Sequence, residues 1–265
     1  MAYKNLCISI MKENRMLDRY LKTVITKCNY SKTTNFESSE NNEKTTHFGF
    51  QTIKESEKTN EVYTVFENVA NYYDIMNDTM SMGIHRIWKD IFIQELGPTH
   101  GTHLLDSAGG TDVGKERANR LGLSQDTNCS ITWKQENAEN FSFPEESFTA
   151  YTIAFGIRNI TYADKVLSEA YRVLQPGGRF LCLEFSHINN GALQWLYDQY
   201  SFQIIPVMGH LITGQWKAYQ YLVESIRRFP KQEDFKDMIQ TAGFRNVTYK
   251  NLTYGMVAIH SGFKL

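Results

Sequence analysis

A glycine turn directly after a short apolar run is the first feature of this sequence that could do chemistry. The run His103-Leu104-Leu105-Asp106 predicts a strand, and Ala108-Gly109-Gly110-Thr111 follows it at once. Glycine lets the backbone approach a ligand without a Cβ in the way, and ligands of parallel α/β sheets bind beyond the carboxyl ends of the strands. The turn alone is weakly specific, since ribose binding also needs an acidic residue at the end of a second strand.

The segments around this turn alternate between strand and helix patterns. Apolar, β-rich runs predict strands at 103–106, 130–133, 148–155, 179–185, 246–249 and 256–263. Helical spacing of apolar residues predicts helices at 63–96 with a break at 77–81, and at 113–123, 163–174 and 232–242. This alternation predicts an α/β fold with a mostly parallel sheet and helices on both faces.

Composition excludes several classes of protein. The 265 residues carry 28 basic and 29 acidic side chains, 42% are hydrophobic, and the net charge is −1. That composition is typical of a globular domain and gives no electrostatic case for nucleic-acid binding. No window resembles the ~18 apolar residues of a membrane helix. The four cysteines lie at 7, 28, 129 and 182 without the spacing of a zinc site, so no metal site is predicted.

The first 46 residues differ in composition from the remainder of the chain. Seven basic and two acidic residues occur between Met1 and Asn35, interleaved with apolar ones, and a stretch rich in Ser, Thr and Asn follows. A basic, acid-poor start with this pattern is typical of a mitochondrial transit peptide. We therefore expect residues 1–46 to be a targeting peptide and disordered linker, with the folded domain at 47–265. The alternative is a disordered tail that carries no targeting signal.

Two long segments, residues 73–88 and 172–186, resemble the signature segments of the ubiquinone/menaquinone biosynthesis C-methyltransferases. Residues 155–159 and 221–230 match the same family, and the eukaryotic branch is the most similar. The resemblance runs from about Thr46 to Leu265. It implies a class I (Rossmann-like) methyltransferase that uses S-adenosylmethionine.

The resemblance also implies a function, a location and partners. The reaction would be C-methylation of a polyprenylated methoxy-benzoquinol ring in coenzyme Q (ubiquinone) biosynthesis. The protein would lie on the matrix side of the mitochondrial inner membrane as a peripheral protein. It would act with other coenzyme Q biosynthesis proteins in a multi-subunit complex, without nucleic acid, and a homodimer is left open.

The sequence departs from the family directly after the glycine turn. The family continues with a full helix, a second strand and its ribose-binding acid, whereas Thr111 is followed here by Asp112-Val113-Gly114, which resembles a later helix. Only 33 positions separate Asp106 from Glu139, enough for one helix and one strand. We therefore expect the first crossover helix, the second strand and the ribose acid to be absent.

For the cofactor, the resemblance implies residues at two turns. The turn from Asp106 through Gly109 to Thr111 would hold the methionine end. The pair Asn137-Ala138 would contact adenine, with the Asn137 side chain accepting a hydrogen bond from the adenine amino group. The alternative for Asn137 is a turn-forming role only.

For catalysis, the resemblance implies Arg158 and Asn159, which follow the fourth strand of the family and would face the reacting ring. Arg158 cannot be a base, because its guanidinium is always charged, so we expect it to stabilise a phenolate or orient a water. The alternative is a buried salt bridge from Arg158 to Asp74 or Asp78. Two histidines are candidate bases, although a lone histidine at the edge of a motif is more often structural: His85 and His187.

A segment of about 190–229 is rich in aromatic residues. Eight aromatic residues lie between Trp195 and Phe229, which suggests an apolar lid over a polyprenyl tail that is taken from a membrane. The alternatives are ordinary core and a dimer surface.

Two other functions compete with the leading hypothesis. A non-catalytic scaffold protein of the biosynthetic complex is favoured by the missing acid. A methyltransferase acting on a different quinone is disfavoured by the mitochondrial-like start.

Overall fold

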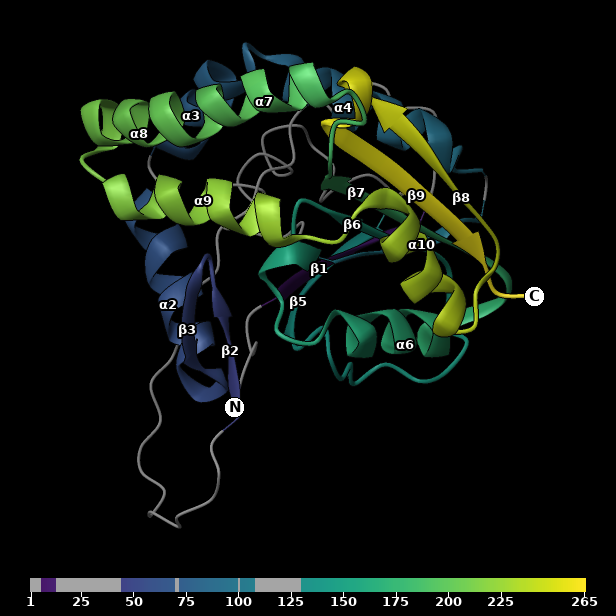
Figure 1. Ribbon diagram of the computed structural model, residues 1–265. Helices are drawn as coiled ribbons and strands as arrows, with labels where there is room; N and C mark the ends of the chain where they lie inside the picture. Colours follow the sequence, from purple (N-terminus) through teal and green to yellow (C-terminus); the bar gives the residue numbers. More distant parts are fainter. Residues whose placement is uncertain (1–5, 13–43, 70–71, 100, 108–129) are drawn as a thin grey trace, which may run out of the picture.

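The computed structural model describes residues 6–12, 44–69, 72–99, 101–107 and 130–265. A seven-stranded sheet with the order β5-β1-β4-β6-β7-β9-β8 forms its centre (Figure 1). The strands of this sheet are β1 (Leu6–Lys12), β4 (His103–Ser107), β5 (Ser130–Glu136), β6 (Phe148–Ala154), β7 (Leu174–Phe185), β8 (Arg245–Leu252) and β9 (Val257–Phe263). A separate hairpin consists of β2 (Thr45–Phe48) and β3 (Gln51–Lys54).

The middle of the sheet is parallel and its flanks contain reversed strands. β4 pairs with β6 and β6 with β7 in parallel, whereas β9 is antiparallel to both β7 and β8. The continuous apolar run of β6 is buried along most of its length, as expected of a parallel strand covered on both faces. The predicted α/β class is therefore confirmed.

β1 occupies the place where the resemblance implies the second strand. It is antiparallel to both neighbours, with Ile8 opposite Ser107 of β4 and Leu6 opposite Glu136 of β5. Leu6–Lys12 thus pairs with both of these strands, whereas the sequence predicts a targeting peptide and disordered linker at residues 1–46. The physical reason is backbone pairing, because β4 and β5 would otherwise each leave a row of unpaired N–H and C=O groups.

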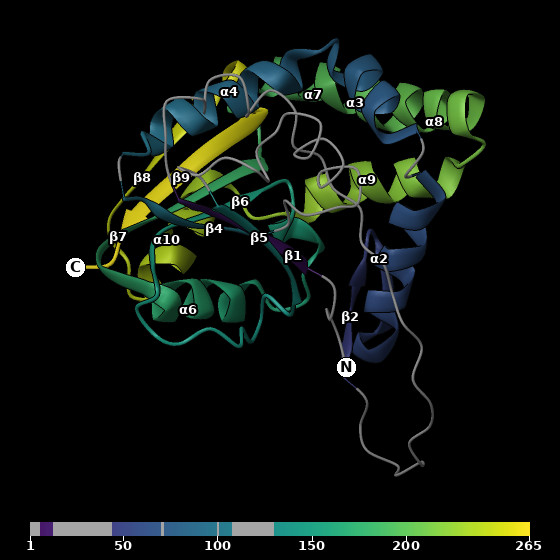
Figure 2. The ribbon, with the colours of Figure 1, turned by 180° about the vertical axis from the view of Figure 1, so that it is seen from behind.

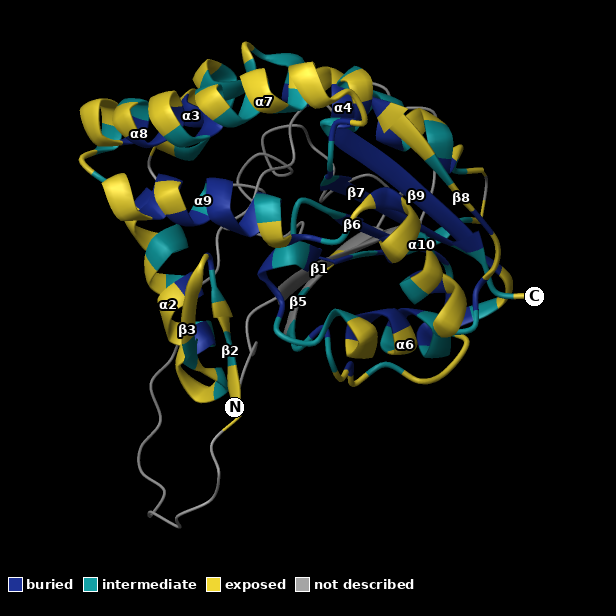
Figure 3. Cartoon of the chain, in the orientation of Figure 1, coloured by how far each residue is buried: buried dark blue, intermediate teal, exposed yellow. Residues whose placement is uncertain are grey.

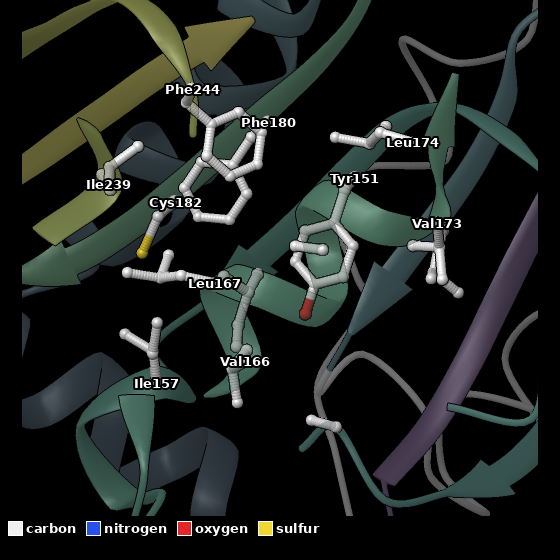
Figure 4. Packing of buried hydrophobic residues seen from close by; sticks show 14 of the residues in the cluster. Tyr151, Ile157, Val166, Leu167, Val173, Leu174, Phe180, Cys182, Ile239 and Phe244 are labelled. Atoms are coloured by element: carbon white, nitrogen blue, oxygen red, sulfur yellow. The ribbon is translucent and has the colours of Figure 1, made fainter. Parts of the chain in front are cut away.

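Helices cover both faces of the sheet. α6 (Ala163–Val173) and α10 (Gln232–Thr241) pack on one face, and α4 (Ile84–Leu96) packs on the other through Trp88, Phe92 and Leu96. Figures 1 and 2 show these two layers from opposite sides. Figure 4 shows the larger core cluster, where the Phe180 ring lies 5.6 Å from that of Tyr151 and 5.1 Å from that of Phe244.

A second helical group adjoins the sheet. Its elements are α2 (Glu55–Val69), α3 (Tyr73–Ser81), α7 (Gly191–Gln199), η4 (Tyr200–Ile204), α8 (Ile205–Thr213) and α9 (Trp216–Arg228). α2, α3, α8 and α9 share a third apolar core that includes Val69, Met76 and Tyr219. Figure 3 shows that the outward faces of α7 and α8 are largely exposed. The predicted aromatic segment is thus partly core and partly surface.

The helical region before β4 is divided differently from the prediction. The expected break at 77–81 lies within α3, which ends at Ser81 and is followed by Met82 and Gly83 with φ angles of 50° and 77°. Packing overrides the weak helix propensity of the polar residues here, since Met76 is almost fully buried. The predicted helix at 113–123 lies outside the described residues, while α6, α10 and the strands after 130 occur close to where the pattern predicts them.

Candidate functional site

A largely apolar pocket lies between the second helical group and the ends of β6 and β7. It encloses about 770 Å³ of space, part of which is open to solvent. Its apolar lining is Val65, Phe66, Val69, Met76, Met80, Phe155, Phe185, Ala218 and Leu222. Its polar lining is Tyr73, Asn77, His85, Lys89, Arg158, Asn159, Tyr219 and Tyr221. Both predicted catalytic residues are therefore brought to one cavity.

Arg158 is held by a buried ion pair. It lies in η3 (Ile157–Asn159), the turn after β6. Its Nη1 atom donates to Glu184 Oε1 at 2.8 Å and to the carbonyl oxygen of Phe155 at 2.8 Å. The Arg158 and Glu184 side chains are 5% and 1% exposed, so the pair is shielded from solvent. The proposed pairing of Arg158 with Asp74 or Asp78 is thus wrong, because Glu184 is the partner.

Glu184 is the residue that sequence reasoning missed. It lies near the end of β7 and accepts further hydrogen bonds from the backbone N–H groups of Arg158 and Phe185, at 3.3 and 2.9 Å. Burial raises the pKa of its carboxyl, and the nearby Arg158 guanidinium opposes that shift. The available signal was a single acid within an otherwise apolar strand, since such a residue needs a buried partner.

One donor of Arg158 is left without a protein partner. Its Nε atom is buried and makes no hydrogen bond to any described residue. An unmade buried hydrogen bond costs about 1–3 kcal/mol, and because this atom is enclosed by protein, a ligand would reach it only after a local rearrangement. A ligand oxygen is the acceptor that suits a guanidinium N–H.

Asn159 is positioned by a chain of contacts from α9 and the hairpin. The hydroxyl of Tyr221 donates to Asn159 Oδ1 at 3.0 Å, and both residues are buried. The ring of Phe48 stacks on that of Tyr221 with centroids 4.2 Å apart. Burial raises the pKa of the Tyr221 phenol, so Tyr221 remains a donor at neutral pH.

The two candidate histidines have different surroundings. His85 lines the pocket. His187 does not, and its Nε2 atom donates to the carbonyl oxygen of Phe229 at 2.9 Å. His187 therefore has a structural role, as expected of a lone histidine at the edge of a motif.

Of the residues predicted to bind the cofactor, Asp106, Asn137 and Ala138 lie at the carboxyl ends of β4 and β5. Asp106 accepts a hydrogen bond from Thr152 Oγ1 at 2.7 Å, and burial raises its pKa to about 6. Its remaining lone pairs could accept from a cationic amine. Gly109 and Thr111 lie outside the described residues.

Asn137 and Ala138 have local structural roles. Asn137 Oδ1 accepts the backbone N–H of Glu139 at 3.0 Å, as the turn-forming alternative predicted. Ala138 is fully buried in the larger core cluster. The structure therefore uses the Asn137 oxygen within the protein and leaves its amide N–H groups for any other partner.

A ribose-binding acid is lacking at the second position of the sheet. β1 contains no Asp or Glu, and it is antiparallel to β4, so its own carboxyl end lies at the opposite edge. Within the described part of the chain, no cluster of three or more His, Cys, Asp or Glu could hold a metal ion. None of the described helices is long and apolar enough to span a membrane.

Comparison with known proteins gives a family match over most of the chain. Residues 52–113 and 111–264 match the model of the ubiE/COQ5 methyltransferase family. A mitochondrial 2-methoxy-6-polyprenyl-1,4-benzoquinol methylase of Drosophila melanogaster is 61% identical, covering 86% of this chain and 88% of the relative. The Homo sapiens protein of the same name is 49% identical, covering 83% and 84%.

The solved structures support the fold. An S-adenosylmethionine-dependent methyltransferase of Thermotoga maritima superposes with a TM-score of 0.51 at 15% identity, over 77% of this chain and 100% of that one.

The same comparisons show where this chain lacks part of the family sequence. The two segments of the family match meet at residues 111–113, where the sequence departs from the family pattern. The alignment with the Drosophila relative spans 265 positions although only 86% of this 265-residue chain takes part. Part of the relative therefore has no counterpart here.

Proposed function

Since the chain belongs to the ubiE/COQ5 methyltransferase family, we propose that it methylates a ring carbon of a polyprenylated methoxy-benzoquinol. S-adenosylmethionine supplies an activated methyl group when bound. The observation that carries the assignment of the ring site is the meeting of Arg158 and Asn159 in one largely apolar pocket. The positive guanidinium suits a ring oxygen, which becomes more negative as the hydroxyl loses its proton.

The residues of this chain supply position and electrostatics. Arg158 would stabilise the developing phenolate, which makes the neighbouring ring carbon a better nucleophile. Glu184 fixes the orientation of Arg158, and Tyr221 fixes that of Asn159. The apolar walls exclude water and hold the ring. The scaffold alternative is not favoured, because the relatives are named as methylases.

The cofactor would lie along the carboxyl edge of β4 and β5. Asp106 would accept from the amino group of the methionine moiety, with Gly109 and Thr111 in the same turn. Asn137 and Ala138 would adjoin the adenine. The half-buried Asp106 carboxyl fits this task, because a cation nearby would favour its charged form.

A radiolabelled methyl transfer assay tests the function. We expect a short-chain methoxy-benzoquinol to be labelled on carbon when the chain carries the relative's segment between Thr111 and Val113. Label on oxygen, or no label with the segment restored, would contradict the proposal. Mass spectrometry of the product separates these outcomes.

We further propose a peripheral contact with a membrane. Large apolar side chains are exposed on α7 and α8, with Trp195, Leu196 and Leu211 at 64%, 59% and 77% exposure. A patch of this kind suits the interface of a bilayer that holds a polyprenyl substrate. The same exposed face could instead bind other coenzyme Q biosynthesis proteins or a second copy of this chain. Both are competing proposals for this surface.

The location is proposed as the matrix side of the mitochondrial inner membrane. The relatives are named as mitochondrial, and residues 1–46 have the composition of a transit peptide. We expect residues 1–46 fused to a fluorescent reporter to direct it to mitochondria. Diffuse cytosolic fluorescence would contradict the targeting role.

A further inference from the structure

His85 contributes a second polar group to the ring pocket. It lies in the first turn of α4, is only 6% exposed and lines the pocket together with Arg158. Its Nδ1 atom lies 2.8 Å from Ser81 Oγ. The role of its other nitrogen depends on which of the two carries the hydrogen.

The hydroxyl of Ser81 determines this tautomer. Ser81 Oγ donates its single hydrogen to the carbonyl oxygen of Asn77 at 2.6 Å. It can therefore only accept from His85, so the hydrogen of the neutral imidazole is on Nδ1. Asp78 Oδ1, which lies 3.8 Å from Nδ1, favours the same arrangement. Nε2 consequently has a lone pair and no hydrogen.

The imidazole is neutral at physiological pH. Burial, followed by the charge of Lys89, lowers the pKa of His85 to about 4; Arg86 adds to this, and Asp78 and Asp74 oppose it. Nε2 has no hydrogen-bond partner among the residues that the structure describes. Its lone pair is thus available to a donor within the pocket.

We propose that Nε2 of His85 accepts a hydrogen bond from a hydroxyl of the ring and thereby selects the reduced hydroquinone over the oxidised quinone. The inference rests on the proposed function, because it takes the ring of that substrate as the occupant. A hydroquinone hydroxyl can donate to Nε2, whereas a quinone carbonyl places its own lone pair against that of the imidazole. Arg158 makes no such distinction, since its N–H donates equally to a hydroxyl or a carbonyl oxygen.

Binding to the 265-residue chain under anaerobic conditions tests this selection. The probes are a 2-methoxy-1,4-benzoquinol with a short prenyl chain and its quinone, each titrated by isothermal calorimetry. We expect the hydroquinone to bind at least roughly tenfold more tightly. His85→Gln should reduce this ratio to about one, because the amide can turn to accept from a hydroxyl or donate to a carbonyl.

Two further variants separate this role from a structural one. Ser81→Ala removes the acceptor that holds the tautomer and should lower the ratio without removing the imidazole. His187→Gln is the matched control outside the pocket and should leave the ratio unchanged. Long-range ¹H–¹⁵N spectra of the wild-type chain should show a protonated Nδ1 and an unprotonated Nε2 for His85, whose Nε2 signal shifts when the hydroquinone binds.

The outcomes distinguish this inference from the proposed function. Equal binding of both ring forms, no binding of the hydroquinone, or a protonated Nε2 would overturn the role of His85. Selective binding without carbon methylation by the restored chain would support His85 and overturn the methyltransferase proposal. Carbon methylation by the restored chain, together with an unchanged hydroquinone-to-quinone affinity ratio in His85→Gln, would support the methyltransferase proposal and overturn the role of His85.

Discussion

The guanidinium of Arg158 bonds to the protein through Nη1 and keeps a buried Nε donor without a described partner. Nη1 is committed to Glu184 and to the carbonyl of Phe155. A buried ion pair of this kind is weak evidence for stability, because desolvation offsets the attraction. It does hold the remaining donor in one place, which is what a reaction that depends on orientation requires.

Replacement of Arg158 should separate catalysis from cofactor binding. In the chain restored across the gap, we expect Arg158→Ala to abolish methyl transfer while S-adenosylmethionine affinity stays within a few-fold. Arg158→Lys retains a cation near Glu184 but lacks the planar fork, so it should fold and still lose most activity. Arg86→Ala, which removes an exposed pair with Asp78, serves as the control. An equal loss of cofactor binding in calorimetry would contradict the assigned role.

Asp106 should make cofactor binding depend on pH. Burial raises its pKa to about 6, so the carboxyl is neutral below that pH and charged above it. Because the charged form attracts an amino group, we expect S-adenosylmethionine to bind more tightly as pH rises through about 6. Asp106→Asn should bind weakly at all pH values and lack this rise. A wild-type affinity that is flat between pH 5 and about 7.5, below the usual range of an α-amino group, would refute the assignment.

At the scale of elements, β1 determines whether the sheet is continuous. It pairs along its length with β4 and β5, which come from other parts of the sequence. In its absence each of these strands would have an unpaired edge, and exposed edges promote aggregation.

Removal of β1 should therefore destabilise this chain. We expect a chain that begins at residue 44 to melt about 5–10 °C lower than the full chain, since several backbone hydrogen bonds are lost. Light scattering should show more aggregation. A matched chain that retains residues 1–12 and has a shortened segment at 13–43 should behave like the full chain. Equal melting of all three would show that β1 contributes nothing to stability.

At the scale of the whole molecule, targeting and folding compete for the same residues. Residues 1–46 have the composition of a transit peptide, yet Leu6–Lys12 completes the sheet. Cleavage after import would remove the strand that occupies the gap.

Restoring the gap should restore cofactor binding. Among the described residues, β1 provides no acid at the position where the family would bind the two ribose hydroxyls, and two lost hydrogen bonds of about 1.5 kcal/mol each would weaken binding roughly 100-fold. We expect no measurable methyl transfer from this chain, and rescue when the relative's segment is restored between Thr111 and Val113. Isothermal titration with S-adenosylmethionine decides the matter. Micromolar binding by the unrepaired chain would indicate that another carboxylate, such as Asp112 or Glu116, replaces the acid.

The sequence by itself determined the class of the fold and pointed to two residues that line the pocket. Strand and helix periods arise from local side-chain patterns, so β4, β6 and α10 occur close to their predicted bounds. The family motifs placed Arg158 and Asn159 after β6, and the structure brings both to one pocket.

Only the tertiary structure decided which distant groups meet. The pairing of Arg158 with Glu184 joins positions 26 residues apart, and β1 joins β4 across almost 100 residues of sequence. The tautomer of His85 depends on the direction of the Ser81 hydroxyl, which is fixed by the helical fold of α3. These features depend on long-range packing and on the satisfaction of buried polar groups, and no local pattern of residue types encodes either.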